Sequence, residues 1–131
     1  TDGNVRKDFP GGFPGDTRSA FTKEGRTKAE NDMFRWTSRL LHWRQGNEVI
    51  TKGKQTQFIP QNGVYVVARS YNGKNVMTVI NGTSKAATMQ AERYAEIIGD
   101  PQEATNILTG HKINISKDVK LAPRGVMVLE F

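Results

Sequence analysis

Residues 62–82 read NGVYVVARSYNGKNVMTVING, and this stretch decides the fold class of the chain. Asn-Gly pairs begin at positions 62, 72 and 81, and Asn-Gly is the strongest short-range signal for a β-hairpin turn. The segments between the pairs, residues 64–69 and 75–80, are rich in β-branched side chains, which favour strands. The stretch therefore predicts consecutive antiparallel strands joined by tight turns.

The same pattern of short apolar runs separated by turn residues continues through the rest of the chain from residue 47. Further strands are expected at 49–52, 55–59, 86–90, 104–108, 112–115, 118–121 and 125–131, and a helical turn at 92–98. No long helical pattern intervenes to make the crossover connections that parallel strands need. We therefore predict a mainly β fold, an antiparallel β-sandwich over residues 47–131, preceded by one helix and an irregular arm.

Residues 27–45 have the pattern of an amphipathic helix. Thr27 and Glu30 form a capping-box sequence at its start. Apolar side chains cover nearly half of the circumference, a wider arc than packing on one sheet requires; they are Ala29, Met33, Phe34, Trp36, Leu40, Leu41 and Trp43. Two interpretations stay open: a helix well buried in a small domain, or a helix between two bodies. The second predicts that Phe34 and Leu41, on the flank of the arc, are exposed in this chain.

Residues 1–26 form a Gly- and Pro-rich arm without helical or strand periodicity. A stretch of this length without regular structure is typical of a functional loop, a linker or a floppy terminus. The arm is the most unusual part of the sequence, and composition alone does not choose between these alternatives.

Composition and charge disfavour several function classes. The net charge is +6 over 131 residues, but the longest like-charge block is Arg6-Lys7, and a nucleic-acid binder needs clustered cations. There is no Cys and there are only two His, which leaves little for a metal site or a His-based catalytic centre. Apolar runs are too short for a transmembrane helix. We therefore expect no nucleic-acid partner, no membrane partner, no metal and no cofactor.

Four strings occur in a specific order along the chain: R-K-D-F-P-G-G-F-P-G-D at 6–16, F-T-K-E-G-R-T at 21–27, L-L-H-W-R-Q-G-N at 40–47, and G-K-x-x-x-F-x-P-x-N-G-V-Y at 53–65. Together they resemble the C-terminal part of α-amylase-family glycoside hydrolases, closest to the cyclomaltodextrinase and neopullulanase-like members. The closing stretch, residues 108–110 followed by 119–129, is similar to the final hairpin of their C-terminal sandwich.

The resemblance implies a domain assignment. Residues 1–46 would be the end of a catalytic (β/α)8 barrel, its last active-site loop and last helix, and residues 47–131 the C-terminal β-sandwich. The family's catalytic carboxylates would lie upstream of Thr1, so no catalytic residue is expected in this chain and it should be inactive alone. Expected partners are its own upstream barrel and, in the intact parent, an α-glucan such as starch, maltodextrin, cyclodextrin or pullulan. Family likeness favours a periplasmic or secreted protein.

Asp2 and Arg6 are the expected substrate-binding residues. Family members often place an Asp and an Arg, four positions apart, in this loop near the glycone-side sugars, and Asp2 and Arg6 have that spacing. Arg offers a planar fork of donors to vicinal hydroxyls, and Asp accepts hydrogen bonds from them. An ordinary loop ion pair is the alternative. Two other functions remain open: a carbohydrate-binding module that stacks sugars on aromatics such as Tyr71, and a basic nucleic-acid-binding domain.

Overall fold

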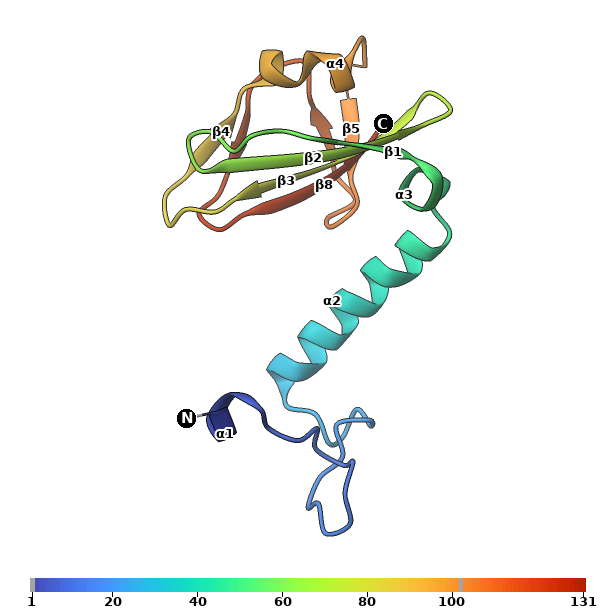
Figure 1. Ribbon diagram of the computed structural model, residues 1–131, viewed down its shortest axis with the longest axis vertical. Helices are drawn as coiled ribbons and strands as arrows, with labels where there is room; N and C mark the ends of the chain where they lie inside the picture. The colour runs from blue at the N-terminus through green and yellow to red at the C-terminus, as the bar shows by residue number, and fades with distance from the viewer. Residues whose placement is uncertain (1, 102) are drawn as a thin grey trace. The chain divides into compact units, whose positions relative to one another are not determined.

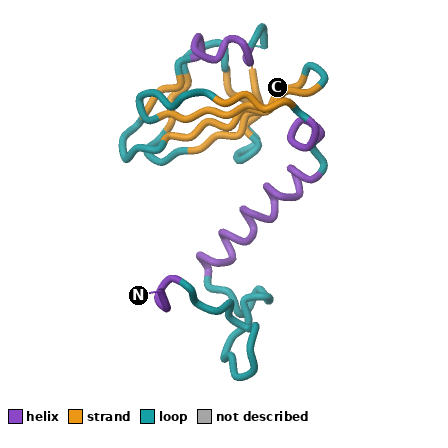
Figure 2. Tube along the Cα trace, in the orientation of Figure 1, coloured by secondary structure: helices purple, strands orange, loops and turns teal. Residues whose placement is uncertain are grey.

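A computed structural model describes residues 2–101 and 103–131. The chain divides into two compact units, Thr1–Trp43 and Arg44–Phe131, and each is described by itself. The first unit holds α1 (Asp2–Val5), an irregular stretch and most of α2 (Lys28–Gln45). The described residues of the second unit form eight strands and three short helical segments, whose course is drawn in Figures 1 and 2.

The second unit is an antiparallel β-sandwich. One sheet has the strand order β1-β2-β3-β8-β5-β6 and the other pairs β4 with β7, and every pairing is antiparallel. The predicted mainly β fold is confirmed. The strands are β1 (Lys54–Gln57), β2 (Val64–Tyr71), β3 (Lys74–Asn81), β4 (Ala87–Met89), β5 (Glu103–Asn106), β6 (Lys112–Asn114), β7 (Val119–Leu121) and β8 (Val126–Glu130), and the helical segments are α3 (Glu48–Lys52), η1 (Ala91–Tyr94) and α4 (Ala95–Ile98).

The β2–β3 hairpin lies at the centre of the large sheet. Tyr71 pairs with Lys74, so Asn72 and Gly73 alone make the turn, with φ of 50° and 76°. Positive φ at both positions is the type I′ geometry whose twist matches the flanking strands, and Asn and Gly tolerate it best. The hairpin predicted from this Asn-Gly pair is confirmed.

The core lies between the two sheets. On β2 and β3 the register pairs Val66 with Val79 and Ala68 with Met77, and all four side chains are buried. Tyr94 closes one end, where its ring meets Phe58 edge-on at 4.9 Å. The other buried members of this core are Val64, Met89, Ala91, Ile98, Ala104, Ile115, Val119, Leu121 and Leu129.

The strand predicted at 49–52 is wrong, because this segment forms α3. The Asn47 side chain accepts a hydrogen bond from the Val49 N–H at 3.0 Å and so caps the helix. Val49 is buried, and Arg69 of β2 donates to the Ile50 carbonyl at 2.9 Å, which fixes the helix to the sheet. A short apolar run has no periodicity that separates a strand from one helical turn.

The third Asn-Gly pair, at residues 81–82, does not form a hairpin. Asn81 ends β3, and the next strand, β4, belongs to the other sheet. The predicted final hairpin is also wrong: β7 pairs with β4, while β8 pairs with β3 and β5. In both places the chain crosses from one sheet to the other instead of folding back on itself.

The Asn81 amide is buried and fully hydrogen-bonded. Its nitrogen donates to the carbonyls of Lys85 at 2.7 Å and Ala122 at 2.9 Å. Its oxygen accepts from the Thr83 N–H at 2.9 Å and the Thr83 hydroxyl at 2.8 Å. Burial of a polar group costs little only when its hydrogen bonds are made. The four bonds of Asn81 therefore hold the segments around Thr83, Lys85 and Ala122 against the end of β3.

We expect Asn81→Ala to lower the free energy of unfolding by about 2–3 kcal/mol, because the four hydrogen bonds of this buried side chain are lost. Urea unfolding of the chain measures the change. The control is Asn114→Ala: Asn114 accepts from the N–H and hydroxyl of Ser116 in the same way but is exposed, and its loss should cost no more than about 0.5 kcal/mol. Equal losses from the two substitutions would contradict the role of burial.

Candidate functional site

The structure brings the two predicted substrate-binding residues together on one helical turn. Asp2 begins α1, and the Arg6 N–H donates to the Asp2 carbonyl at 3.0 Å. Residues four apart on a helical turn share a face, and both side chains are exposed. Within residues 2–101 and 103–131, no salt bridge or side-chain hydrogen bond engages either of them, so the alternative of a loop ion pair between the two is not observed.

The arm after α1 is a series of hydrogen-bonded turns. One carboxylate oxygen of Asp16 accepts from the N–H groups of Gly11 at 2.7 Å and Phe13 at 3.1 Å. Gly11 has φ of 94°, and a Cβ at this position would lie 2.5 Å from the Ser19 hydroxyl, so the turn requires glycine. The expected irregular arm is confirmed apart from the short helix α1.

A two-pronged ion pair fastens the arm to the start of α2. The Arg18 guanidinium donates to both carboxylate oxygens of Glu30, at 2.8 and 2.9 Å. Glu30 also accepts from the Thr27 N–H at 2.8 Å, and the Glu30 N–H donates to the Thr27 hydroxyl at 3.2 Å. The predicted capping box is confirmed. Hydrogen bonds from Arg18 and then from Thr27 lower the pKa of Glu30 from its ordinary 4.5 to about 2.

A second set of contacts joins the arm to the same helix. Arg26 donates to the Asn31 side-chain oxygen at 2.9 Å and to the Ala20 carbonyl at 3.0 Å. The Asn31 amide nitrogen returns a bond to the Lys23 carbonyl at 3.0 Å. The Arg26 guanidinium lies 4.0 Å from the centre of the Phe34 ring, in a cation–π contact. Sequence reasoning missed the contacts of Arg18, Arg26 and Asn31, because the distance along the chain between these residues and their partners follows no helical or strand period.

Much of the apolar arc of α2 is exposed. None of the helix residues is buried. Phe34 is 52% exposed and Leu41 55%, as the interpretation of a helix between two bodies predicts. Exposed apolar side chains gathered on one face mark an interaction surface, so the helix is not well buried within its own unit.

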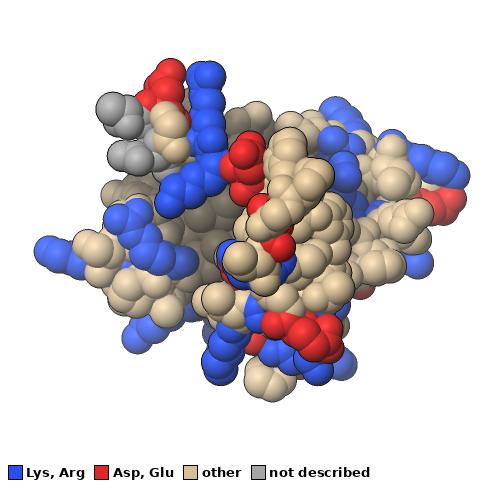
Figure 3. Space-filling model, turned by 90° about the horizontal axis from the view of Figure 1, so that it is seen from below, with Lys and Arg blue, Asp and Glu red and all other residues tan. Residues whose placement is uncertain are grey.

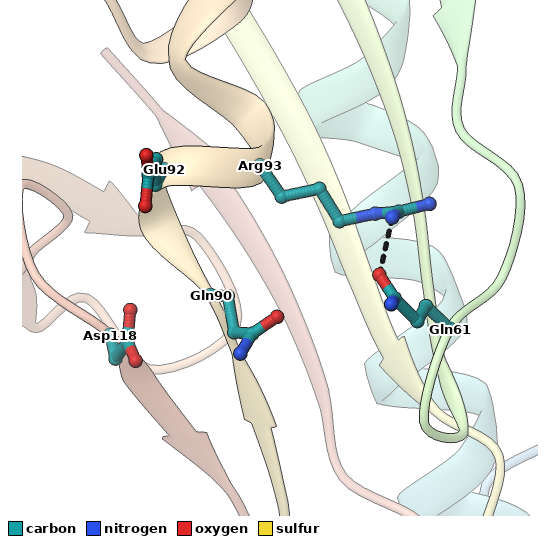
Figure 4. Close-up of a pocket in the computed structure, with 5 residues that line it drawn as sticks. All are labelled: Gln61, Gln90, Glu92, Arg93 and Asp118. Carbon is teal, nitrogen blue, oxygen red and sulfur yellow. Dashed lines mark hydrogen bonds between the residues drawn. The ribbon is translucent and has the colours of Figure 1, made fainter.

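A polar cleft of about 330 Å³ lies on the sandwich (Figure 4). Its lining residues all carry hydrogen-bonding side chains and come from the turn before β2, the segment from the end of β4 into η1, and the start of β7: they are Gln61, Gln90, Glu92, Arg93 and Asp118. In Figure 4, Arg93 reaches across to the Gln61 carbonyl, while Glu92 and Asp118 lie on the other side of Gln90. Sequence reasoning did not single out this cluster.

The structure gives little support to an aromatic sugar platform. Tyr71, the aromatic proposed for stacking, is half-buried, with the Lys52 ammonium 5.9 Å from the ring centre. All other aromatic side chains of Arg44–Phe131 are buried or half-buried. The exposed aromatic rings that the structure describes belong to the first unit: Phe9, Phe13, Phe21, Phe34 and Trp36.

Charge and metal-ligand placement add no further site. On the face seen in Figure 3, Lys and Arg side chains are spread among acidic and uncharged ones. In the described part of the chain, no three His, Asp or Glu side chains are arranged to hold a metal ion. The helices within the same residues are all too short or too polar to span a bilayer.

Comparison with known families identifies the sandwich. A model of the cyclo-malto-dextrinase C-terminal domain matches residues 55–130, more than half of the chain. The match covers the sandwich from β1 to the end of β8.

Several solved structures share this fold. AmyP in complex with maltose matches with a TM-score of 0.66 at 18% identity, over 79% of this chain and 21% of AmyP. An α-amylase from Geobacillus thermoleovorans, complexed with acarbose, gives 0.64 at 17% identity, over 80% and 23%. A maltogenic α-amylase from Thermotoga neapolitana gives 0.62 at 17% identity, over 78% and 26%. The chain thus spans about a fifth to a quarter of these proteins.

We expect the Glu30 carboxyl to titrate with a pKa of about 2 in a side-chain NMR titration. Because folding lowers this pKa, the Arg18–Glu30 pair contributes stability above pH 4.5, and the contribution is lost as the pH falls towards 2. Arg18→Met should raise the pKa of Glu30 towards 4.5, since the first cause of the shift is removed. Arg35→Met is the control, because Arg35 pairs with Asp32; an equal rise there would refute the assignment.

Proposed function

This chain belongs to the cyclo-malto-dextrinase C-terminal domain family, and from that membership we propose that it is the C-terminal part of a glycoside hydrolase that acts on α-glucans. Cyclomaltodextrinase- or neopullulanase-like specificity is the finer form of the proposal. The observation that carries it is the match over residues 55–130, on a sandwich whose fold is shared with α-amylases.

The proposal assigns each part of the chain a place in the parent enzyme. Residues 1–46 are the last active-site loop and last helix of an upstream (β/α)8 barrel, and residues 47–131 are the sandwich that stabilises it. The uncovered apolar arc of α2 supports this assignment, because a last barrel helix has a barrel to pack against. In such barrels the loops at the carboxyl ends of the strands build the active site. An active-site loop must hold its side chains in place, and the hydrogen-bonded turns of the arm would do so.

In this assignment Asp2 and Arg6 contact a sugar away from the bond that is cut. The two side chains share a face of one helical turn and have no hydrogen-bond or ion-pair partner among the described residues, so both are available to vicinal hydroxyls. The Arg6 guanidinium donates two parallel hydrogen bonds to the sugar, and the Asp2 carboxylate accepts from it. The cut itself needs a pair of carboxylates in a cleft, which the proposal places in the upstream barrel.

We expect the 131-residue chain alone to release no reducing sugar from starch, maltodextrin, cyclodextrin or pullulan. The physical reason is that hydrolysis needs a positioned acid and nucleophile or base, and the proposal places these carboxylates in the upstream barrel. The enzyme with its upstream barrel, assayed in parallel, should be active. Reproducible hydrolysis by the chain alone, abolished by an Asp-to-Asn change within it, would disprove the non-catalytic assignment, and an inactive longer protein would disprove the proposed function.

Arg6→Ala in the barrel-containing enzyme should raise KM for a long maltodextrin with little change in kcat, because the lost bond is equally strong in the ground and transition states. A charge-assisted hydrogen bond contributes about 1.5–3 kcal/mol, or roughly 10- to 150-fold in kcat/KM. Asp2→Asn should give a smaller loss of the same kind. Lys7→Ala, which removes the adjacent exposed cation, is the control. Equal losses on maltotriose and on long maltodextrin, together with a lower Tm, would indicate a structural role instead.

A further inference from the structure

The polar cleft on the sandwich has two walls that are already fixed by the fold. On one side the Arg93 guanidinium donates to the Ile59 carbonyl at 2.7 Å and to the Gln61 side-chain carbonyl. On the other side one carboxylate oxygen of Asp118 accepts from the Ala91 N–H at 3.0 Å. These bonds use one polar atom of Gln61 and one of Asp118. The amide nitrogen of Gln61 and the second oxygen of Asp118 are thus pre-positioned at little entropic cost to a ligand.

Two further side chains in the cleft have no partner in the part of the chain that the structure describes. Among the described residues, no hydrogen bond or ion pair engages the Gln90 amide or the Glu92 carboxylate. Both residues are exposed, and Figure 4 shows the Gln90 side chain between the two carboxylates and the Arg93–Gln61 pair. The cleft therefore presents amide donors and carboxylate acceptors together within about 330 Å³.

This set of groups suits a neutral polyhydroxyl ligand. An anion meets two carboxylates, and the single guanidinium is already bonded to the protein. A cation is attracted by the two carboxylates but also meets the Arg93 guanidinium and the N–H groups of Gln61, whose oxygen is already bonded. Sugar hydroxyls donate and accept at once, so they satisfy amide and carboxylate groups in the same site. The volume lies at the lower end of the range for small-molecule sites, about 300–1,000 Å³, and fits a short saccharide segment.

We infer that this cleft is a hydrogen-bonding site for a short segment of α-glucan on the sandwich itself. The choice of α-linked glucose rests on the proposed function, whereas the saccharide class rests on the cleft itself. Binding is weak, because the side chains are exposed to water and none of the described residues that line the site is aromatic. On a polymeric substrate a weak second site still raises the effective concentration of chain near the barrel.

The test is a titration of the isotope-labelled 131-residue chain with maltotriose, followed by NMR. We expect saturable shifts at the side-chain amides of Gln61 and Gln90 and at the backbone of η1, without dependence on salt, because the ligand is neutral. Gln90→Ala should weaken binding about 2- to 10-fold, and Glu92→Gln about 10-fold, as expected for neutral and charge-assisted hydrogen bonds. Arg124→Gln is the matched control: Arg124 is exposed and also donates to a carbonyl, that of Gly82, but does not line the cleft.

Three outcomes would overturn the inference: no saturable shift with maltotriose, unchanged affinity in Gln90→Ala and Glu92→Gln, or an equal loss in Arg124→Gln. Spectra of the variants without sugar check that the fold is intact. Cellotriose, titrated in parallel, should bind more weakly, and a preference for it would refute the α-glucan assignment. The hydrolysis assay with the upstream barrel tests the proposed function independently. An active enzyme without sugar binding in the cleft would disprove only the cleft assignment, and an inactive enzyme would disprove the proposed function.

Discussion

The side-chain amide of Asn81 and its surroundings hold together the two places where the chain changes sheets. One crossing runs from β3 to β4 and the other from β7 to β8. Asn81 donates from its backbone to the Gly125 carbonyl and from its amide to the Ala122 carbonyl, both at 2.9 Å. In the opposite direction, the Arg124 backbone N–H donates to the Thr83 carbonyl at 2.9 Å, and the Arg124 guanidinium donates to the Gly82 carbonyl at 2.6 Å. Because both crossings are tied to each other, the two sheets are held face to face at this end of the sandwich.

Local patterns predict those elements whose structure is decided locally. The β2–β3 hairpin follows from Asn72-Gly73 because two positive φ angles suffice to set it. The same dipeptide at Asn81-Gly82 misleads, because burial of the Asn side chain and its four hydrogen bonds override the turn preference. The strand predicted at 49–52 is wrong for a similar reason. The Asn47 cap and the burial of Val49 stabilise a helix there, and neither can be inferred from a run of four residues.

Candidate binding groups are harder to find from sequence than strands. The spacing of Asp2 and Arg6 draws attention only through resemblance to a family, and the structure then places both side chains on one face of a helical turn. The cleft residues come from segments as far apart as Gln61 and Asp118, so only the folded sandwich assembles them. Arg18 and Glu30 are likewise twelve positions apart, and no periodicity links them.

The buried Asn81 has a consequence for production of this protein in eukaryotic cells. Asn81-Gly82-Thr83 and Asn114-Ile115-Ser116 both match the acceptor tripeptide for N-linked glycans. A sugar attached to the Asn81 nitrogen during translocation replaces a hydrogen that the folded chain donates to Lys85 or Ala122, and it has no space in the sandwich. Asn114 is exposed and accommodates the same modification. Glycosylation at Asn81 and folding of the sandwich therefore exclude each other. Secretion from yeast or mammalian cells requires a substitution at Thr83 that removes the acceptor tripeptide, whereas production in the bacterial cytoplasm does not.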